Sequence, residues 1–271
     1  IATAMRDQPT VQIIMTPLPP VATVPAAPVP VHRTPEFSRE AVTSPPGLLG
    51  DVMRFIHDLS PRPVAEVSLT AAIGLLAGMA GRAYNVSGTG LNQYVILMGT
   101  TGIGKDMLSI GIDTLINALR GPIPAIQTFR GPGSLASGQG LVRFLSDTSS
   151  SFVSVIGEIG HLMQRLSSPK RAPTDIALKR VLLDLYGRSG RGMTFQPTAY
   201  SDGKKDTKIV EAPAVTLVGD TTPEALYEAL DESMVADGLL PRFLFISYHG
   251  HRPHLVESAV GEAVGRLYVE R

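Results

Sequence analysis

One segment of the chain combines glycines, a lysine and an acidic residue at a spacing that suits phosphate binding. It reads Gly99-Thr100-Thr101-Gly102-Ile103-Gly104-Lys105-Asp106. This fits the Gly-x-x-x-x-Gly-Lys pattern of a P-loop, in which glycines let the main chain curl and point its N–H groups at phosphate oxygens. An apolar run precedes the segment and a helical pattern follows it, so a helix N-terminus adds partial positive charge. We predict that the loop binds ATP, with Lys105 at the β- and γ-phosphates. A glycine-rich turn without a ligand is the alternative.

The acidic residues around this loop depart from the usual metal-binding arrangement. The residue after the lysine is normally Ser or Thr, whose hydroxyl binds Mg²⁺, but here it is Asp106. The run Phe152–Ile156 fits the Walker B strand, which is normally followed by two acids. The second acid, which orients the attacking water, is present as Glu158. The position of the first acid is occupied by Gly157. We hypothesise that Asp106 supplies the Mg²⁺ carboxylate that Gly157 cannot, beside Glu158. In the alternative, Asp106 is a helix-capping residue and the metal site is weak or lost.

Two further polar positions flank predicted strands. Asp220 and Thr221 follow the run Ala214–Val218, and polar residues at the carboxyl end of a parallel strand lie beside the ligand crevice. Asp220 or Thr221 is therefore a candidate sensor of the γ-phosphate or the attacking water, whereas Thr222 before Pro223 is typical of a helix cap. Arg242 precedes the run Phe243–Ser247 and is a candidate arginine finger, or an ordinary arginine at the edge of a strand.

Positive charge gathers in one part of a chain whose 24 basic and 24 acidic residues balance. Residues 161–210 hold ten Lys and Arg against four Asp. Within them, 192–198 and 208–212 are predicted to pair as a hairpin whose Asp-Gly turn carries Lys204 and Lys205. We predict that these lysines grip the backbone of single-stranded DNA, although a solvated surface loop is the simpler alternative. Arg188 and Arg191 are alternative candidates for facing a neighbouring active site.

Other metal chemistry has little support. The chain has no cysteine, which excludes disulfides, zinc thiolates, iron–sulfur clusters and cysteine nucleophiles. His249, His251 and His254 follow a strand pattern that is interrupted by Pro253, with no nearby acid before Glu257, so we interpret them as loop residues.

Strand and helix patterns alternate along the chain. The predicted strands are 83–86, 93–98, 125–129, 152–156, 214–218 and 243–247. The predicted helices are 48–59, 64–81, 106–119, 134–146, 173–186 and 223–230. Near-continuous apolar runs are typical of strands buried on both faces of a parallel sheet. The alternation predicts an α/β fold of the P-loop NTPase kind, with a parallel sheet flanked by helices.

The beginning of the chain has a different composition. Residues 1–46 hold ten of the 22 prolines, which predicts an extended arm or linker, with Val11–Met15 as the part best suited to dock on a neighbouring subunit. We expect three parts: the arm at 1–46, an N-terminal helical subdomain at 47–91 and a P-loop ATPase core at 92–271. The apolar stretch 69–80 is too short to cross a bilayer, so no membrane partner is expected, and the lack of cysteine suits the cytoplasm of a bacterial host cell. Because the chain begins at Ile1, we expect it to be a fragment of a longer protein.

The order of these pieces resembles a family of P-loop ATPases found in phage, prophage and mobile-element replication proteins, often fused to a primase-like domain. The matching segments are AAIGLLAGMAGRAYNV, QYVILMGTTGIGKD, FVSVIGEIGHLM, VTLVGDTTPEAL and DGLLPRFLFI. The last is also similar to the Ser-Arg-Phe finger of minichromosome maintenance helicases. The resemblance implies a homo-oligomeric, hexameric AAA+ or superfamily 3-type ring, with Lys105 at the phosphates, Glu158 as the catalytic acid and Arg242 acting on a neighbour's nucleotide.

Three functions are compatible with these features. The first is an ATP- and Mg²⁺-dependent motor of a replicative DNA helicase or translocase. The second is a nucleotide-gated assembly or loader module with slow or no hydrolysis, which the Asp106 and Gly157 departures favour. The third is a DNA-packaging or defence ATPase with similar parts.

Overall fold

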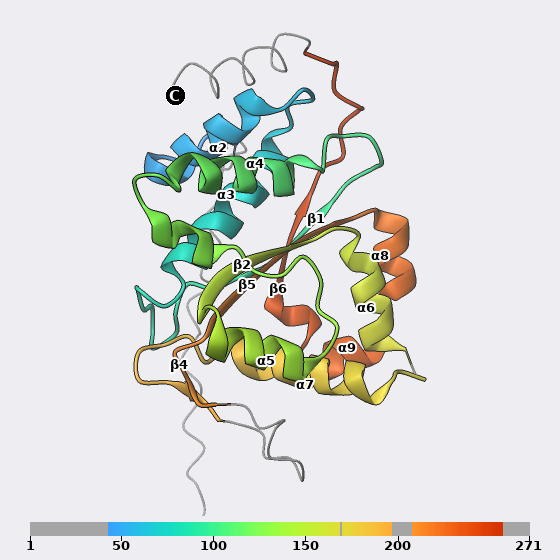
Figure 1. Ribbon diagram of the computed structural model, residues 1–271. Helices are drawn as coiled ribbons and strands as arrows, with labels where there is room; N and C mark the ends of the chain where they lie inside the picture. The colour runs from blue at the N-terminus through green and yellow to red at the C-terminus, as the bar shows by residue number, and fades with distance from the viewer. Residues whose placement is uncertain (1–42, 169, 197–207, 257–271) are drawn as a thin grey trace, which may run out of the picture. The chain divides into compact units, whose positions relative to one another are not determined.

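Four parallel strands form the sheet at the centre of the unit that the computed structural model describes, and they confirm the predicted α/β class (Figure 1). They are β1 (Tyr94–Met98), β2 (Ser151–Ile156), β5 (Ala214–Thr221) and β6 (Phe243–Ser247), in the order β2-β5-β1-β6. Each corresponds to a predicted apolar run. Met98 lies opposite Thr221 on one side and Ser247 on the other, so the strands end together at one edge of the sheet. We call this the carboxyl edge, and the opposite one the amino edge.

The structure describes residues 43–168, 170–196 and 208–256. The chain divides into a unit up to Phe37 and a second from Ser38 to Arg271. The predicted arm at 1–46 therefore lies outside the described residues as far as residue 42. The helices of the predicted N-terminal subdomain belong to the same unit as the sheet.

One face of the sheet is covered by α2 (Gly47–Leu59), α3 (Ala65–Ala80) and α4 (Met107–Leu119) (Figure 1). The middle helix, α3, is built from small apolar residues and is buried along most of its length. A Cβ placed on Gly78 would lie 2.8 Å from the Val153 Cβ, so glycine allows α3 to pack closely on β2. This packing joins the helices before β1 to the hydrophobic core of the sheet.

The other face is covered by a second group of helices (Figure 1). These are α5 (Gly138–Asp147), α6 (Ile159–Ser167), α7 (Pro173–Tyr186), α8 (Pro223–Ala229) and α9 (Glu232–Ala236). Strand residues alternate between the two cores: Tyr94 and Ile96 face this group, whereas Leu97 faces α3 and α4. The fully buried Tyr94 hydroxyl donates to the Leu182 carbonyl oxygen at 3.0 Å, which satisfies its polar group. Burial raises the pKa of Tyr94.

Two predicted strands are wrong. Residues 125–129 lie in a 3-10 helix, η1 (Pro124–Phe129), because Pro124 at its start fixes a helical φ and lacks the N–H that a sheet would need. Residues 83–86 form turns with only an isolated bridge from Val86 to Thr89, and the Tyr84 and Val86 side chains are exposed. Helices α6 and α9 were not predicted.

A short antiparallel pair confirms the base of the predicted hairpin. β3 (Thr194–Phe195) pairs with β4 (Val210–Glu211). The turn with Lys204 and Lys205 lies outside the described residues. Over the described part of the chain, no helix combines the length and the apolar character needed to cross a membrane.

Candidate functional site

The predicted phosphate loop leaves β1 at the carboxyl edge and leads into α4. Gly102 and Gly104 have φ angles of 83° and 85°, a left-handed conformation that glycine adopts without strain. Ile103 between them is fully buried in the core under α4, and so anchors the middle of the loop. The exposed Thr100 and Thr101 lie on the outer side. The sequence Gly99–Asp106 therefore forms a turn between a buried strand and a helix.

Lys105 and Asp220 meet at this edge. The Lys105 Nζ lies 3.3 Å from the Asp220 Oδ2, and their side chains are only 9% and 13% exposed. Asp220 pairs in register with Leu97, the second last residue of β1, which places the carboxylate next to the start of the loop. The Gly99 N–H also donates to the Thr221 carbonyl oxygen at 3.1 Å, fixing the loop to β5.

Glu158 joins the same cluster from β2. It has a φ of 49°, an uncommon left-handed conformation for a residue other than glycine, and it directly precedes α6. The main chain and the charge of Glu158 both influence the pKa of the Asp220 carboxyl. The Glu158 side chain is exposed. The structure thus brings together three residues that are more than fifty positions apart in sequence.

The electrostatics of Asp220 follow from this cluster. Burial raises the pKa of the Asp220 carboxyl, and the nearby Glu158 charge acts in the same direction, whereas Lys105 opposes the rise. A carboxyl of raised pKa beside a lysine and a second carboxyl is typical of functional sites.

The raised pKa predicts a pH effect on stability. Folded Asp220 keeps its proton at a pH where the unfolded chain has lost it. The stability that this group contributes therefore falls as the pH rises from 3.8, the ordinary pKa of an aspartate, through the raised pKa of the folded protein. We expect the unfolding free energy of Asp220→Asn, relative to the wild type, to increase with pH across that window. Urea unfolding at several pH values measures it.

Asp147→Asn is the control of opposite sign. Hydrogen bonds from Lys208 and Ser146 lower the pKa of Asp147, so its contribution is present above 3.8 and is lost as the pH falls. Its variant should lose stability relative to the wild type as the pH rises. Equal pH profiles for both variants would contradict the assignment for Asp220.

The structure gives separate information on the Mg²⁺ hypothesis. Asp106 precedes α4 with an exposed side chain and makes no capping hydrogen bond, so the capping alternative lacks its expected contact. A Cβ on Gly157 would meet nothing within 4 Å, so an acid fits there.

Thr222 caps α8, as predicted. Its side chain accepts from the Ala225 N–H at 3.3 Å, and Pro223 follows at the first helical position.

Two arginines near the loop were not predicted. The segment Tyr248–Val256 continues from β6 along the loop, and a Cβ on Gly102 would lie 3.2 Å from the Arg252 Nε. A Cβ on Gly104 would lie 3.1 Å from the Arg62 carbonyl oxygen. No local sequence pattern marks these contacts, because they join the loop to residues some forty positions before it and 150 after it.

Arg242 lies at the opposite edge of the sheet. It directly precedes Phe243, which pairs with Tyr94 at the start of β1, whereas Lys105 follows the end of β1. Its guanidinium donates to the Gly238 carbonyl oxygen at 2.5 Å and lies over the Tyr186 ring at 5.8 Å, while its Nε is buried without a partner. Arg242 therefore cannot serve the loop of its own chain, and a role at a nucleotide requires another chain.

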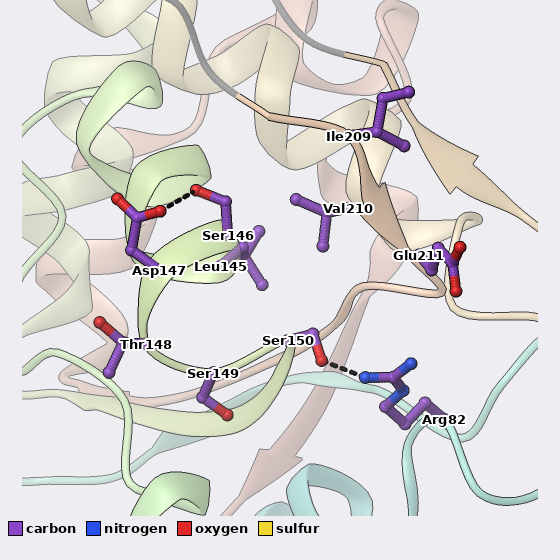
Figure 2. A pocket seen from close by; sticks show the side chains of 10 residues that line it. All are labelled: Arg82, Leu145, Ser146, Asp147, Thr148, Ser149, Ser150, Ile209, Val210 and Glu211. Atoms are coloured by element: carbon purple, nitrogen blue, oxygen red, sulfur yellow. Dashed lines mark hydrogen bonds between the residues drawn. The ribbon is translucent and has the colours of Figure 1, made fainter.

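Basic side chains also gather near the amino edge, around the base of the hairpin. Arg188, Arg191 and Lys208 are exposed there, and Arg82 reaches the Ser150 hydroxyl. Figure 2 shows the adjoining hollow, a cavity of about 330 Å³ between the end of α5 and β4, with Arg82 on one wall and Asp147 on the other. Lys179, one of the ten basic residues in 161–210, is not available to bind DNA, because it is buried in an ion pair with Asp237.

The histidines at 249, 251 and 254 lie in a segment without helix or strand. Among the residues that the structure describes, no group of three or more His, Asp or Glu is placed to hold a metal ion.

Comparison with models of known protein families and with curated protein sequences found no match for this chain.

Proposed function

We propose that this protein binds and hydrolyses ATP at the carboxyl edge of its sheet. One observation carries the proposal: Lys105, Asp220 and Glu158 meet at the end of a glycine loop that connects a buried parallel strand to a helix. Ligands of such sheets bind outside the carboxyl ends of the strands. Lys105 would contact the phosphates, Glu158 would act on the attacking water, and Asp220 would sense the γ-phosphate.

The location of Arg242 supports a ring of identical subunits. Its distance from the loop of its own chain fits a finger that completes the site of a neighbour. The basic residues near the amino edge lie at the opposite end of β2 and β5 from Glu158 and Asp220. Strands β2 and β5 would therefore connect a single-stranded DNA site at the hairpin, at one edge of the sheet, with the nucleotide site at the other edge. The proposed activity is that of a DNA helicase or translocase motor.

A mixing experiment tests this proposal. Each subunit of Lys105→Ala keeps its finger but has a defective loop, whereas Arg242→Ala keeps its loop but lacks the finger. We expect each variant alone to lose ATP turnover stimulated by single-stranded DNA, and an equimolar mixture to recover part of it. Native mass spectrometry with and without ATP shows whether mixed oligomers form. Mixed oligomers without recovery would contradict action of Arg242 on a neighbour.

The second candidate is a nucleotide-gated assembly module that hydrolyses slowly. The absence of an acid at Gly157 favours it, because the usual Mg²⁺ ligand at that place is missing. Tight ATP binding and nucleotide-dependent assembly without turnover would support this candidate over the motor.

The hypothesis that Asp106 replaces the acid missing at Gly157 makes a prediction of its own. If Asp106 supplies the Mg²⁺ carboxylate, Asp106→Ala should lower Mg²⁺-dependent ATP turnover by about tenfold or more, the effect of losing one charged ligand. Because the space at Gly157 is open, adding Gly157→Asp to that variant should restore part of the turnover. Phosphate release at several Mg²⁺ concentrations measures both. Wild-type turnover in Asp106→Ala would end the hypothesis.

A further inference from the structure

A strap of nine residues, Tyr248–Val256, crosses beside the glycine loop on leaving β6. Its first residue donates a main-chain N–H to the Met98 carbonyl oxygen at 2.8 Å, at the end of β1. Its last residue donates to the Pro61 carbonyl oxygen at 2.9 Å, in the turn after α2. Between them, Arg62 donates from its guanidinium to the Pro253 carbonyl oxygen at 2.5 Å. The strap is thus tied at three points to the elements that surround the loop.

Arg252 in the middle of the strap lies against the loop itself. A Cβ built on Gly102 would be 3.2 Å from its Nε and 3.4 Å from its Cζ, so the guanidinium lies directly beside the main chain of the loop. The Arg252 side chain is exposed to solvent, and no acid or carbonyl oxygen among residues 43–168, 170–196 and 208–256 accepts a hydrogen bond from it. Its donors are therefore available to a ligand.

The neighbouring charges explain what such a ligand would be. Lys105 pairs with Asp220, and the Arg62 guanidinium donates to the Pro253 carbonyl oxygen, so part of the donor capacity of each is already used. A guanidinium presents a planar, permanently charged set of donors that matches the oxygens of a phosphate group. Beside main-chain N–H groups of a curled glycine loop, it suits a polyphosphate better than a carboxylate or an uncharged group.

We propose that Arg252 is a second cationic contact for the polyphosphate, beside Gly102 and in addition to Lys105. The inference rests on the proposed function, because it requires that the loop holds a phosphate chain. It assigns the binding preference of the site: Arg252 favours nucleoside triphosphates over monophosphates, since its contact is with the phosphate chain and not with the base.

Calorimetric titration of the full chain with ATP, AMP and inorganic tripolyphosphate tests the proposal. We expect Arg252→Ala to weaken binding of ATP and of tripolyphosphate by about tenfold to a hundredfold, the effect of losing one or two charge-assisted hydrogen bonds, and to leave AMP binding unchanged. Arg252→Lys should keep part of the affinity, since it retains the charge but loses the planar donors. Because Arg252 is exposed, the melting temperature without ligand should not change.

Two comparisons make the result specific. Arg143→Ala removes another exposed arginine, on α5 across the sheet, and should bind all three probes like the wild type. Wild-type affinity for ATP and tripolyphosphate in Arg252→Ala, with loss of binding in Lys105→Ala, would overturn the role of Arg252 and leave the proposed function standing. A wild-type protein that binds neither probe would overturn both. An equal loss of affinity for all three probes would also contradict a contact with the phosphate chain.

Discussion

Replacement of Lys105 by alanine is expected to weaken ATP binding by about 30-fold or more, because loss of a buried charge partner costs about 2 kcal/mol or more. The lysine side chain is 9% exposed and pairs with Asp220. Without it, the phosphates would lie beside the carboxylates of Asp220 and Glu158 with less compensating positive charge. Titration of a fluorescent ATP analogue measures the change.

The chain offers a matched control for this variant. Lys208 also pairs with an aspartate, with 3.1 Å between its Nζ and the Asp147 Oδ1, but this pair is exposed and lies at the amino edge of the sheet. Lys208→Ala should bind ATP like the wild type when no DNA is present. Because Lys105→Ala also leaves Asp220 without its partner, the double variant with Asp220→Asn separates the loss of binding from a loss of stability. Unchanged ATP affinity in Lys105→Ala would contradict the assignment of the loop.

Replacement of Glu158 by glutamine is expected to lower ATP turnover by about 10²- to 10⁴-fold, the usual contribution of a general base, while ATP binding persists. The exposed carboxylate of Glu158 is held at the end of β2 beside Asp220, where a water molecule could attack the terminal phosphate. The amide keeps the shape but cannot accept the proton. Phosphate release and ATP affinity should be measured on the same preparation.

Glu224→Gln serves as the control, because this exposed acid lies in the first turn of α8 and has no assigned role in the site. It should turn over ATP at the wild-type rate. If Glu158→Gln kept full turnover while Lys105→Ala abolished it, the site would bind ATP but use another group to activate water.

The sequence predicted the parts of the fold that depend on local pattern. Strands buried on both faces need continuous apolar runs, so β1 and β5 were predictable, and the first helical residue of α7 was marked by Pro173. Helix α6 was missed because no capping side chain announces it: Glu158 precedes it in a left-handed conformation. Residues 125–129 are apolar enough for a strand, but Pro124 before them favours the 3-10 helix that they form.

The candidate site was predictable only in part for a related reason. Gly99–Asp106 and the ends of two strands could be located from sequence, and parallel strands that end at one edge bring Lys105, Glu158 and Asp220 together. The approach of Arg252 to Gly102 depends on how the strap is tied to residues nearly 200 positions away. Such contacts follow from tertiary packing and leave no periodic signal.

Calorimetric titration of ATP with Mg²⁺ into the wild-type protein tests the central claim most directly. We predict a saturable heat of binding with one nucleotide per chain, which disappears in Lys105→Ala. Titration without any heat of binding, or with the same heat in both proteins, would contradict it.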